Sequence, residues 1–222
     1  MIVVPVIVSV VAAAVGASLV AHAERKYAGI TANQESWRPR LRAWTIDVTL
    51  IILSGQGLFV LAPLGVWGCV ATTFIAVGCY GSLRLDLRFH VIPDRFQIAG
   101  ALGGAGWLLS QVARPSPAHI AIECLLGLAF PLGLWACGSI YERVRGIAGM
   151  GMGDLKVLAW TGVILGRDNW LVIALAVGAA AVILVIHRLT RGPYRATEPF
   201  AFAPYLILGF VGAVASRYLT VG

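Results

Sequence analysis

The sequence predicts an all-α fold, a polytopic membrane helix bundle of about eight transmembrane helices. Of its 222 residues, 59% are hydrophobic and 12% are charged, whereas an average soluble domain carries roughly 25% charged residues. The apolar residues form long runs, several of which approach the ~20 residues needed to cross a hydrocarbon core. The basic residues gather in alternate loops between these runs, which predicts an orientation with both termini outside (N-out and C-out).

Eight apolar runs define the expected helices. The first starts at residue 2 with no basic segment before it, which argues against a cleaved signal peptide. The fourth is rich in glycine, as is typical of a membrane helix that packs closely on its neighbours. The sixth is short and ends at residues 166–168. The runs cover residues 2–21, 43–61, 66–83, 96–112, 119–141, 157–165, 169–187 and 200–219.

We expect a single transmembrane domain over residues 1–222. Residues 1–65 would supply two spans joined by a short basic cytoplasmic loop, and residues 66–222 would form the core that carries the acidic motifs described below.

The basic residues determine the predicted orientation. Of the 17 Lys and Arg residues, all but Arg114, Arg167 and Arg217 lie in the loops 23–43, 84–95, 142–156 and 188–199. The positive-inside rule places these four loops in the cytoplasm. A net charge of +7 would suggest a nucleic-acid partner for a soluble protein. Here we assign the charge to contact with anionic lipid and expect no nucleic-acid partner.

Two acidic residues at the cytoplasmic edge are the main candidate functional residues. Asp154 follows the alternating glycines Gly149, Gly151 and Gly153, and Asp86 follows the third apolar run. Alternating glycines let the backbone approach another segment closely. A carboxylate at the edge of hydrocarbon is costly, so its presence indicates a functional site. The alternative for Asp154 is that it only caps the helix that follows.

Two carboxylates that can meet predict aspartic-protease chemistry. At short range they share one proton, because like charges cannot both ionise without cost. The ionised carboxylate takes a proton from the attacking water, and the protonated carboxyl donates to the peptide carbonyl oxygen. This chemistry requires neither a metal nor a nucleophilic side chain.

Three motifs together resemble those of the type IV prepilin peptidases, membrane aspartic proteases of the glycine-x-glycine-Asp kind. Asp86 is followed after six residues by Pro93 and Asp94, and residues 151–156 read Gly-Met-Gly-Asp-Leu-Lys. Residues 202–209, Phe-Ala-Pro-Tyr-Leu-Ile-Leu-Gly, resemble the family's Phe-Gly-Pro-Phe-Leu-x-x-Gly in the last helix. The resemblance covers roughly residues 66 to 220 and makes residues 66–222 the protease core.

The resemblance implies the roles of the site residues. Asp86 and Asp154 would be the catalytic pair. The remaining residues would form the active-site loop (Gly149, Gly151, Gly153 and Lys156) or support the site structurally (Pro93 and Asp94).

The resemblance also implies the reaction. The enzyme would lie in the bacterial cytoplasmic (inner) membrane and need no cofactor. It would cut the basic leader from pilin or pseudopilin precursors of a type IV pilus or type II secretion system. The cut would fall at the cytoplasmic face, just before the precursor's hydrophobic helix.

The sequence departs from the longer members of that family. Those carry a zinc-binding domain with two C-x-x-C pairs between the first two spans, whereas loop 23–43 holds no cysteine. The four cysteines here, Cys69, Cys79, Cys124 and Cys137, are dispersed in apolar runs, so we expect no metal site. Longer members also N-methylate the new amino terminus, and the missing domain argues against that activity here.

Other polar residues have structural interpretations. We expect Asp94 to cap the fourth helix, and Lys156 to have a local structural role. Asp47 is expected to form an interfacial pair with Arg42, and Glu123 a structural hydrogen bond.

Two other function classes remain open from the sequence. One is an intramembrane protease of broader specificity, like presenilin, which shares the glycine-x-glycine-Asp loop. The other is a non-catalytic assembly or transport protein on the same scaffold. A secondary transporter would usually show inverted repeats and charges at the midplane, and the sequence shows neither.

Overall fold

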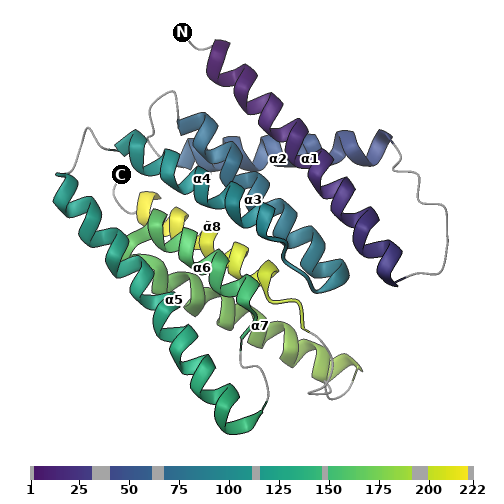
Figure 1. Ribbon diagram of the computed structural model, residues 1–222, viewed down its shortest axis with the longest axis vertical. Coiled ribbons are helices and arrows are strands. Elements are labelled where there is room, and N and C mark those ends of the chain that lie inside the picture. Colours follow the sequence, from purple (N-terminus) through teal and green to yellow (C-terminus); the bar gives the residue numbers. More distant parts are fainter. Residues whose placement is uncertain are drawn as a thin grey trace. The chain divides into compact units, whose positions relative to one another are not determined.

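The structure is a computed structural model that describes residues 3–31, 41–61, 68–111, 116–146, 150–191 and 200–219 (Figure 1). Within these residues all regular structure is helical, which confirms the predicted all-α class. The chain forms two compact units, Met1–Ser116 and Pro117–Gly222.

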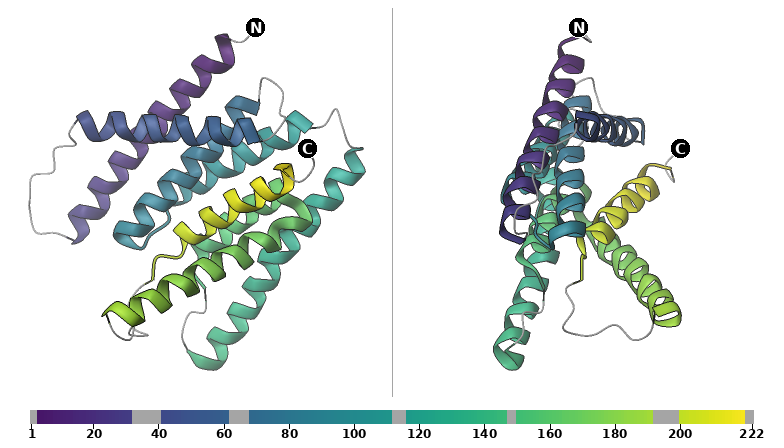
Figure 2. Two further views of the ribbon diagram at one scale, coloured as in Figure 1. Left: turned by 180° about the vertical axis from the view of Figure 1, so that it is seen from behind. Right: turned by 90° about the vertical axis from the view of Figure 1, so that its right-hand side faces the viewer.

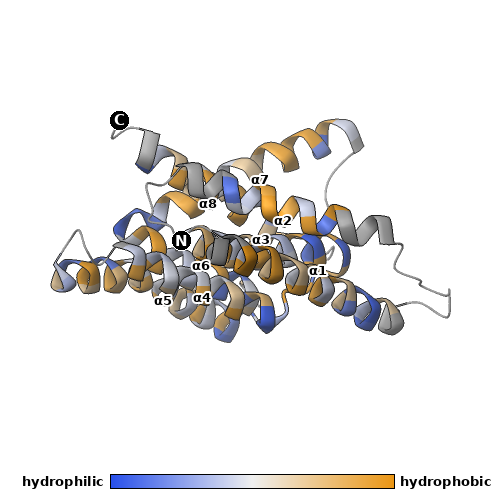
Figure 3. Ribbon diagram, turned by 90° about the horizontal axis from the view of Figure 1, so that it is seen from above, coloured by the Kyte–Doolittle hydropathy of each residue, from blue (hydrophilic) through white to orange (hydrophobic). Residues whose placement is uncertain are grey.

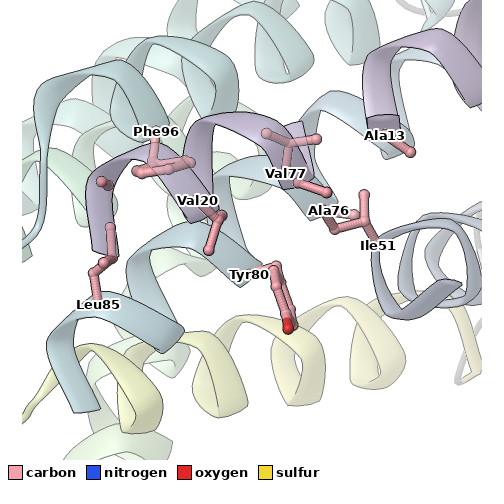
Figure 4. Packing of buried hydrophobic residues seen from close by; sticks show 10 residues of the cluster. Ala13, Val20, Ile51, Ala76, Val77, Tyr80, Leu85 and Phe96 are labelled. Carbon is pink, nitrogen blue, oxygen red and sulfur yellow. The ribbon is translucent and has the colours of Figure 1, made fainter. Parts of the chain in front are cut away.

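The first unit is built around α3 (Gly68–Phe89), which contacts α1 (Val3–Thr31), α2 (Leu41–Leu61) and α4 (Asp94–Gln111). The apolar window of α3 is 78% buried, the largest share among the candidate spans. Helices α3 and α4 form an antiparallel hairpin, and α2 crosses α1 at a steep angle (Figure 2). Figure 4 shows the core of this unit, where Ile51 of α2 lies beside Ala76 of α3, and Val77 of α3 packs against α1 at Gly16.

Glycines let α3 and α4 approach closely. A Cβ placed on Gly78 would lie 2.9 Å from the Cα of Gly100, and a Cβ on Gly103 would lie 2.6 Å from the backbone nitrogen of Ile75. Both distances are shorter than real Cβ contacts, so larger residues would separate the two backbones. The prediction that the glycine-rich fourth run packs closely is therefore confirmed.

The second unit contains α5 (Pro117–Arg145), α6 (Met152–Leu165), the 3₁₀ turn η1 (Gly166–Asp168), α7 (Asn169–Arg191) and α8 (Ala203–Leu219). Gly127 of α5 and Gly162 of α6 cross in backbone contact, with no room for a Cβ on either residue. Helix α8 packs against α7 and also contacts α6. Much of α7 is apolar along its length (Figure 3).

Four segments of the described residues are long and apolar enough to cross a membrane: Ile7–Ala28, Gly68–Phe89, Pro117–Arg145 and Met152–Thr190. Two shorter apolar helices are Ile46–Gln56 and Ala203–Arg217. These segments are those of a multi-pass membrane protein. They do not establish the expected number of about eight spans or the N-out, C-out orientation, which stay predictions.

The ends of several helices were predicted wrongly. Helix α3 continues to Phe89, so Asp86 lies on a helix and not in a loop that starts at residue 84. Similarly, α1 continues to Thr31 and α5 to Arg145. Apolar runs underestimate these helices because charged residues remain helical where they find partners. Arg84, for example, pairs with Glu24 of α1.

Candidate active site

Asp86 lies in the last turn of α3 and is buried, with 6% of its surface exposed. Its backbone oxygen accepts a hydrogen bond from the backbone nitrogen of His90 at 3.0 Å. His90 has a φ of 54°, a left-handed conformation that ends the helix. The chain then reaches α4 within three residues, so Asp86 is held at a tight helix–helix connection.

Helix α4 begins directly beside this connection. Asp94 is its first residue, and the backbone nitrogen of Phe96 donates to the oxygen of Pro93 at 3.1 Å. A carboxylate in the first turn is stabilised by the positive end of the helix dipole. This position suits the expected structural role of Asp94, and the cap itself stays a prediction.

A buried polar pair lies one helical turn before Asp86. The Nε2 of Gln97 in α4 donates to the Oγ of Ser82 in α3 at 2.7 Å, and both residues are buried. Ser82 and Asp86 are four residues apart and therefore share one face of α3. The α4 side of α3 is thus the side that carries Asp86.

Asp154 occupies the third position of α6, and the N-cap residue is Gly151 (φ −66°, ψ 135°). The backbone nitrogens of Asp154 and Leu155 donate to the oxygen of Gly151 at 3.1 and 3.3 Å. The alternative that Asp154 serves as the N-cap residue of this helix is therefore wrong. Its carboxylate still lies in the first turn, where the helix dipole favours a negative charge.

The glycine loop gives the Asp154 carboxyl its space. A Cβ on Gly151 would lie 3.1 Å from Oδ2 of Asp154, closer than most real Cβ contacts. Gly153 is the second residue of α6, and Gly149 lies outside the described residues. Lys156 is half-buried on the same helix, and its expected structural role stays a prediction.

The opposite end of α6 is fixed by a polar network that the sequence did not reveal. The Nδ2 of Asn169 donates to the oxygens of Gly127 (3.1 Å) and Leu158 (3.0 Å), and its Oδ1 accepts from Thr161 (2.9 Å). Asn169 is 1% exposed. The sequence feature that could have indicated this network is the asparagine at the start of an apolar run.

Two charged residues make separate hydrogen bonds at the same end of α6. Oε2 of Glu123 accepts a hydrogen bond from the backbone nitrogen of Arg167 at 3.1 Å, which confirms the structural hydrogen bond predicted for Glu123. Arg217 at the end of α8 donates to the oxygen of Leu165 at 3.0 Å. The helix that carries Asp154 is therefore anchored at its far end.

Helices α6 and α8 run in parallel, which places the third motif near the level of Asp154. Trp160 packs edge-on against Phe210 with ring centroids 5.4 Å apart, and Arg217 reaches Leu165 further along both helices. Because both helices rise by the same distance per residue, the same offset towards their N-termini places Tyr205 at the level of Asp154.

Aromatic rings gather at the start of α8. Phe200 stacks on Tyr205 with centroids 5.3 Å apart, and Phe202 lies 6.3 Å from Tyr205. The oxygen of Phe202 accepts from the backbone nitrogens of Tyr205 and Leu206 at 3.0 and 3.2 Å. Ala203, which replaces the usual glycine of this motif, is fully buried.

Asp47 has two partners that the sequence did not predict. Its Oδ1 accepts hydrogen bonds from Tyr80 at 2.5 Å and from Arg84 at 3.2 Å, both on α3. The side chain of the expected partner, Arg42, lies outside the described residues.

Each unit thus presents one carboxylate near a helix end, Asp86 in the first and Asp154 in the second. That the two carboxylates meet stays a prediction. Among the described residues no group of three or more His, Cys, Asp and Glu side chains could hold a metal ion.

Comparison with known proteins shows a consistent family likeness. The model of the type IV leader peptidase family matches residues 69–186. A "Prepilin leader peptidase/N-methyltransferase" of Burkholderia pseudomallei (strain 1026b) is 42% identical over 166 residues, which cover 72% of this chain and 52% of the relative.

Two further relatives carry the same name. That of Xanthomonas campestris pv. campestris is 34% identical over 130 residues (57% of this chain, 43% of the relative). That of Aeromonas salmonicida (strain A449) is 27% identical over 177 residues (79% and 56%). This chain therefore spans about half the length of the curated relatives it matches. No solved structure matches.

Proposed function

We propose that this chain, which belongs to the type IV leader peptidase family, is a membrane aspartic endopeptidase. It would remove the basic leader from type IV prepilin-like precursors. One observation carries the proposal. Asp86 and Asp154 both lie inside the matched residues 69–186, each in a terminal turn of a helix. A terminal turn places each acid near the end of its helix, and so near the surface of the bilayer and away from its midplane.

The proposed mechanism uses both acids. Asp86 and Asp154 share one proton, and the ionised carboxylate removes a proton from water as the water attacks the scissile carbonyl. The protonated carboxyl donates to the carbonyl oxygen, and proton transfer in the opposite sense then releases the amine. Burial of Asp86 supports this role, because a low dielectric favours proton sharing over two separate charges.

We place the reaction at the cytoplasmic face of the bacterial inner membrane. The proposed topology has about eight spans in one domain, with both termini outside and residues 66–222 as the protease core. The distribution of basic residues supports this orientation, because 14 of the 17 fall in the segments 23–43, 84–95, 142–156 and 188–199, on the side to which the orientation assigns Asp86 and Asp154. The same segments would contact anionic lipid.

We assign only the peptidase activity to this chain, although the relatives' name includes N-methyltransferase. The segment that separates α1 from α2 is short and contains no cysteine, so it offers no zinc-binding thiolates. The cysteines lie within α3 and α5 instead.

The test is a cleavage assay with the purified full chain in proteoliposomes. The probe is a synthetic precursor segment in which a basic leader is joined to an apolar helix, and mass spectrometry identifies the new amino terminus. Wild type should release the leader, whereas Asp86→Asn and Asp154→Asn should each abolish release. The Asn variants keep the size of the side chain, so thermal unfolding should change little. Release by either variant at the wild-type rate would remove that acid from the mechanism.

A further inference from the structure

An ion cluster with two buried carboxylates joins three helices of the first unit close to Asp86. Its members are Glu24 of α1, Asp47 of α2, and Tyr80 and Arg84 of α3. Arg84 Nε donates to Glu24 Oε1 at 2.8 Å, while its Nη1 donates to Asp47 Oδ1 at 3.2 Å and to the Tyr80 hydroxyl at 3.1 Å. Glu24 and Asp47 are each 3% exposed.

The cluster occupies one stripe of α3. Tyr80, Arg84 and Arg88 are spaced four residues apart, and Arg88 Nη1 lies 3.6 Å from Glu24 Oε1. Asp86 follows Arg84 by two residues and is therefore rotated by about 200° around the helix. The cluster and Asp86 thus lie on opposite sides of the same two turns.

The two sides of α3 have different anchors. On the Asp86 side, Ser82 accepts a hydrogen bond from Gln97 of α4. On the other side, Arg84 binds acids from α1 and α2. A guanidinium is a planar fork with fixed donor directions, so its contacts to two carboxylates define the rotation and depth of α3. Both carboxylates are buried, which limits the access of water to their side of these bonds, while the Arg84 side chain itself is 32% exposed.

We propose that Arg84 is a positioning residue for Asp86, an inference that rests on the proposed function. Through Glu24 and Asp47 it fixes the last turn of α3, so that the Asp86 carboxyl is held in the orientation that proton transfer requires. Helices α1 and α2 lie outside the residues matched by the family model, yet they supply both acids of the cluster. They therefore contribute to catalysis through the geometry of α3.

The competing explanation is that the cluster only stabilises the fold. The same three helices offer a matched control, because they are also joined at the far end of α3. There Cys69 Sγ contacts Nε2 of Gln56 (α2) at 3.1 Å and Oγ of Ser9 (α1) at 3.4 Å. Cys69 is 17 residues from Asp86, about 26 Å along the helix. Loosening this end should affect stability without moving Asp86.

The first test compares Arg84→Lys with Cys69→Ala in the proteoliposome cleavage assay. Lysine keeps the positive charge but loses the fork. Arg84→Lys should lower kcat about tenfold to hundredfold and leave KM nearly unchanged, because a misplaced catalytic group slows the chemical step. Cys69→Ala should keep the wild-type kcat per folded molecule. A wild-type kcat in Arg84→Lys, or an equal loss of kcat in both variants, would overturn the inference.

A second variant covers the case in which Arg84→Lys does not fold. Tyr80→Phe keeps every charge and removes only the hydroxyl that bridges Arg84 and Asp47. Tyr80→Phe should lower kcat by a smaller factor than Arg84→Lys does, with KM nearly unchanged. An unchanged kcat in a folded Tyr80→Phe protein would contradict the proposed role of the cluster.

The third readout does not depend on cleavage. The thiol introduced by Asp86→Cys is labelled with a water-soluble maleimide, and labelling at position 86 is quantified by peptide mass spectrometry. Adding Arg84→Lys should change the labelling rate several-fold, whereas adding Cys69→Ala should not. Equal rates with and without Arg84→Lys would reject the positioning role. Failure of wild type to cleave the probe would instead reject the proposed function and leave this measurement valid.

Discussion

Gly151 and Asp154 are in direct contact at the start of α6: a Cβ on Gly151 would lie 3.1 Å from Oδ2 of Asp154. The absence of a side chain at Gly151 therefore determines where the Asp154 carboxyl can lie. Gly151 is also the N-cap residue, and its oxygen accepts the first backbone hydrogen bonds of the helix.

Gly151→Ala should reduce cleavage while the protein stays folded. The added methyl must displace the Asp154 carboxyl by a few tenths of an ångström, and small displacements of a catalytic group can lower rates about tenfold or more. We expect a lower kcat in the proteoliposome assay. Gly138→Ala is the control, because a Cβ there meets nothing within 4 Å. Equal activity of the two variants would show that the Gly151 contact does not matter.

Asp94→Asn should retain most of the activity. Asp94 is the first residue of α4, and asparagine is about as good as aspartate at a helix N-terminus. The cleavage rate and the thermal unfolding temperature should both stay near the wild-type values. A loss as large as that of Asp86→Asn would assign Asp94 a direct part in the chemistry.

Gly127→Ala should destabilise the second unit. Its Cβ would collide with the backbone of Gly162, where α5 crosses α6, and neither backbone can yield as a flexible side chain would. Overpacking of this kind typically lowers the free energy of unfolding by about 1–3 kcal/mol. Thermal unfolding in detergent should show a clear decrease relative to wild type. The matched control is Gly133→Ala, which has open space on the same helix.

Incubation with a metal chelator should leave both cleavage and the unfolding temperature unchanged, because the proposed mechanism uses two carboxylates and water. The same samples, supplied with S-adenosylmethionine, should give a product without an added methyl group. Mass spectrometry of the new amino terminus measures this directly. Loss of activity with the chelator, restored by zinc, would contradict a metal-free mechanism, and a methylated product would contradict the peptidase-only assignment.

The sequence predicted the helices well because apolar runs are a local property. Each predicted run coincides with a helix in the described residues. The helix ends were less predictable, since they depend on partners that are distant in the chain. Arg84 extends α3 by pairing with Glu24, 60 residues earlier, and no local pattern reports such a pair.

For the candidate site, the sequence likewise predicted the residues but not their structural setting. The identity of Asp154 and its glycines followed from the motif, but its position inside α6 did not, because a carboxylate before an apolar run resembles an N-cap. The anchoring of α6 by Asn169 and Arg217 was also missed. Each of these residues binds backbone oxygens on other helices, which depends on how the helices pack.

The proposed mechanism requires that the carboxyls of Asp86 and Asp154 meet, and cross-linking measures this most directly. Asp86→Cys and Asp154→Cys are combined in a chain whose four native cysteines are replaced by serine, and a short bifunctional thiol reagent is added in proteoliposomes. Trp160→Cys with Phe210→Cys is the positive control, because these rings lie 5.4 Å apart. We expect efficient cross-linking of positions 86 and 154 within one chain. Cross-linking of the control pair without any at positions 86 and 154 would contradict the two-aspartate site.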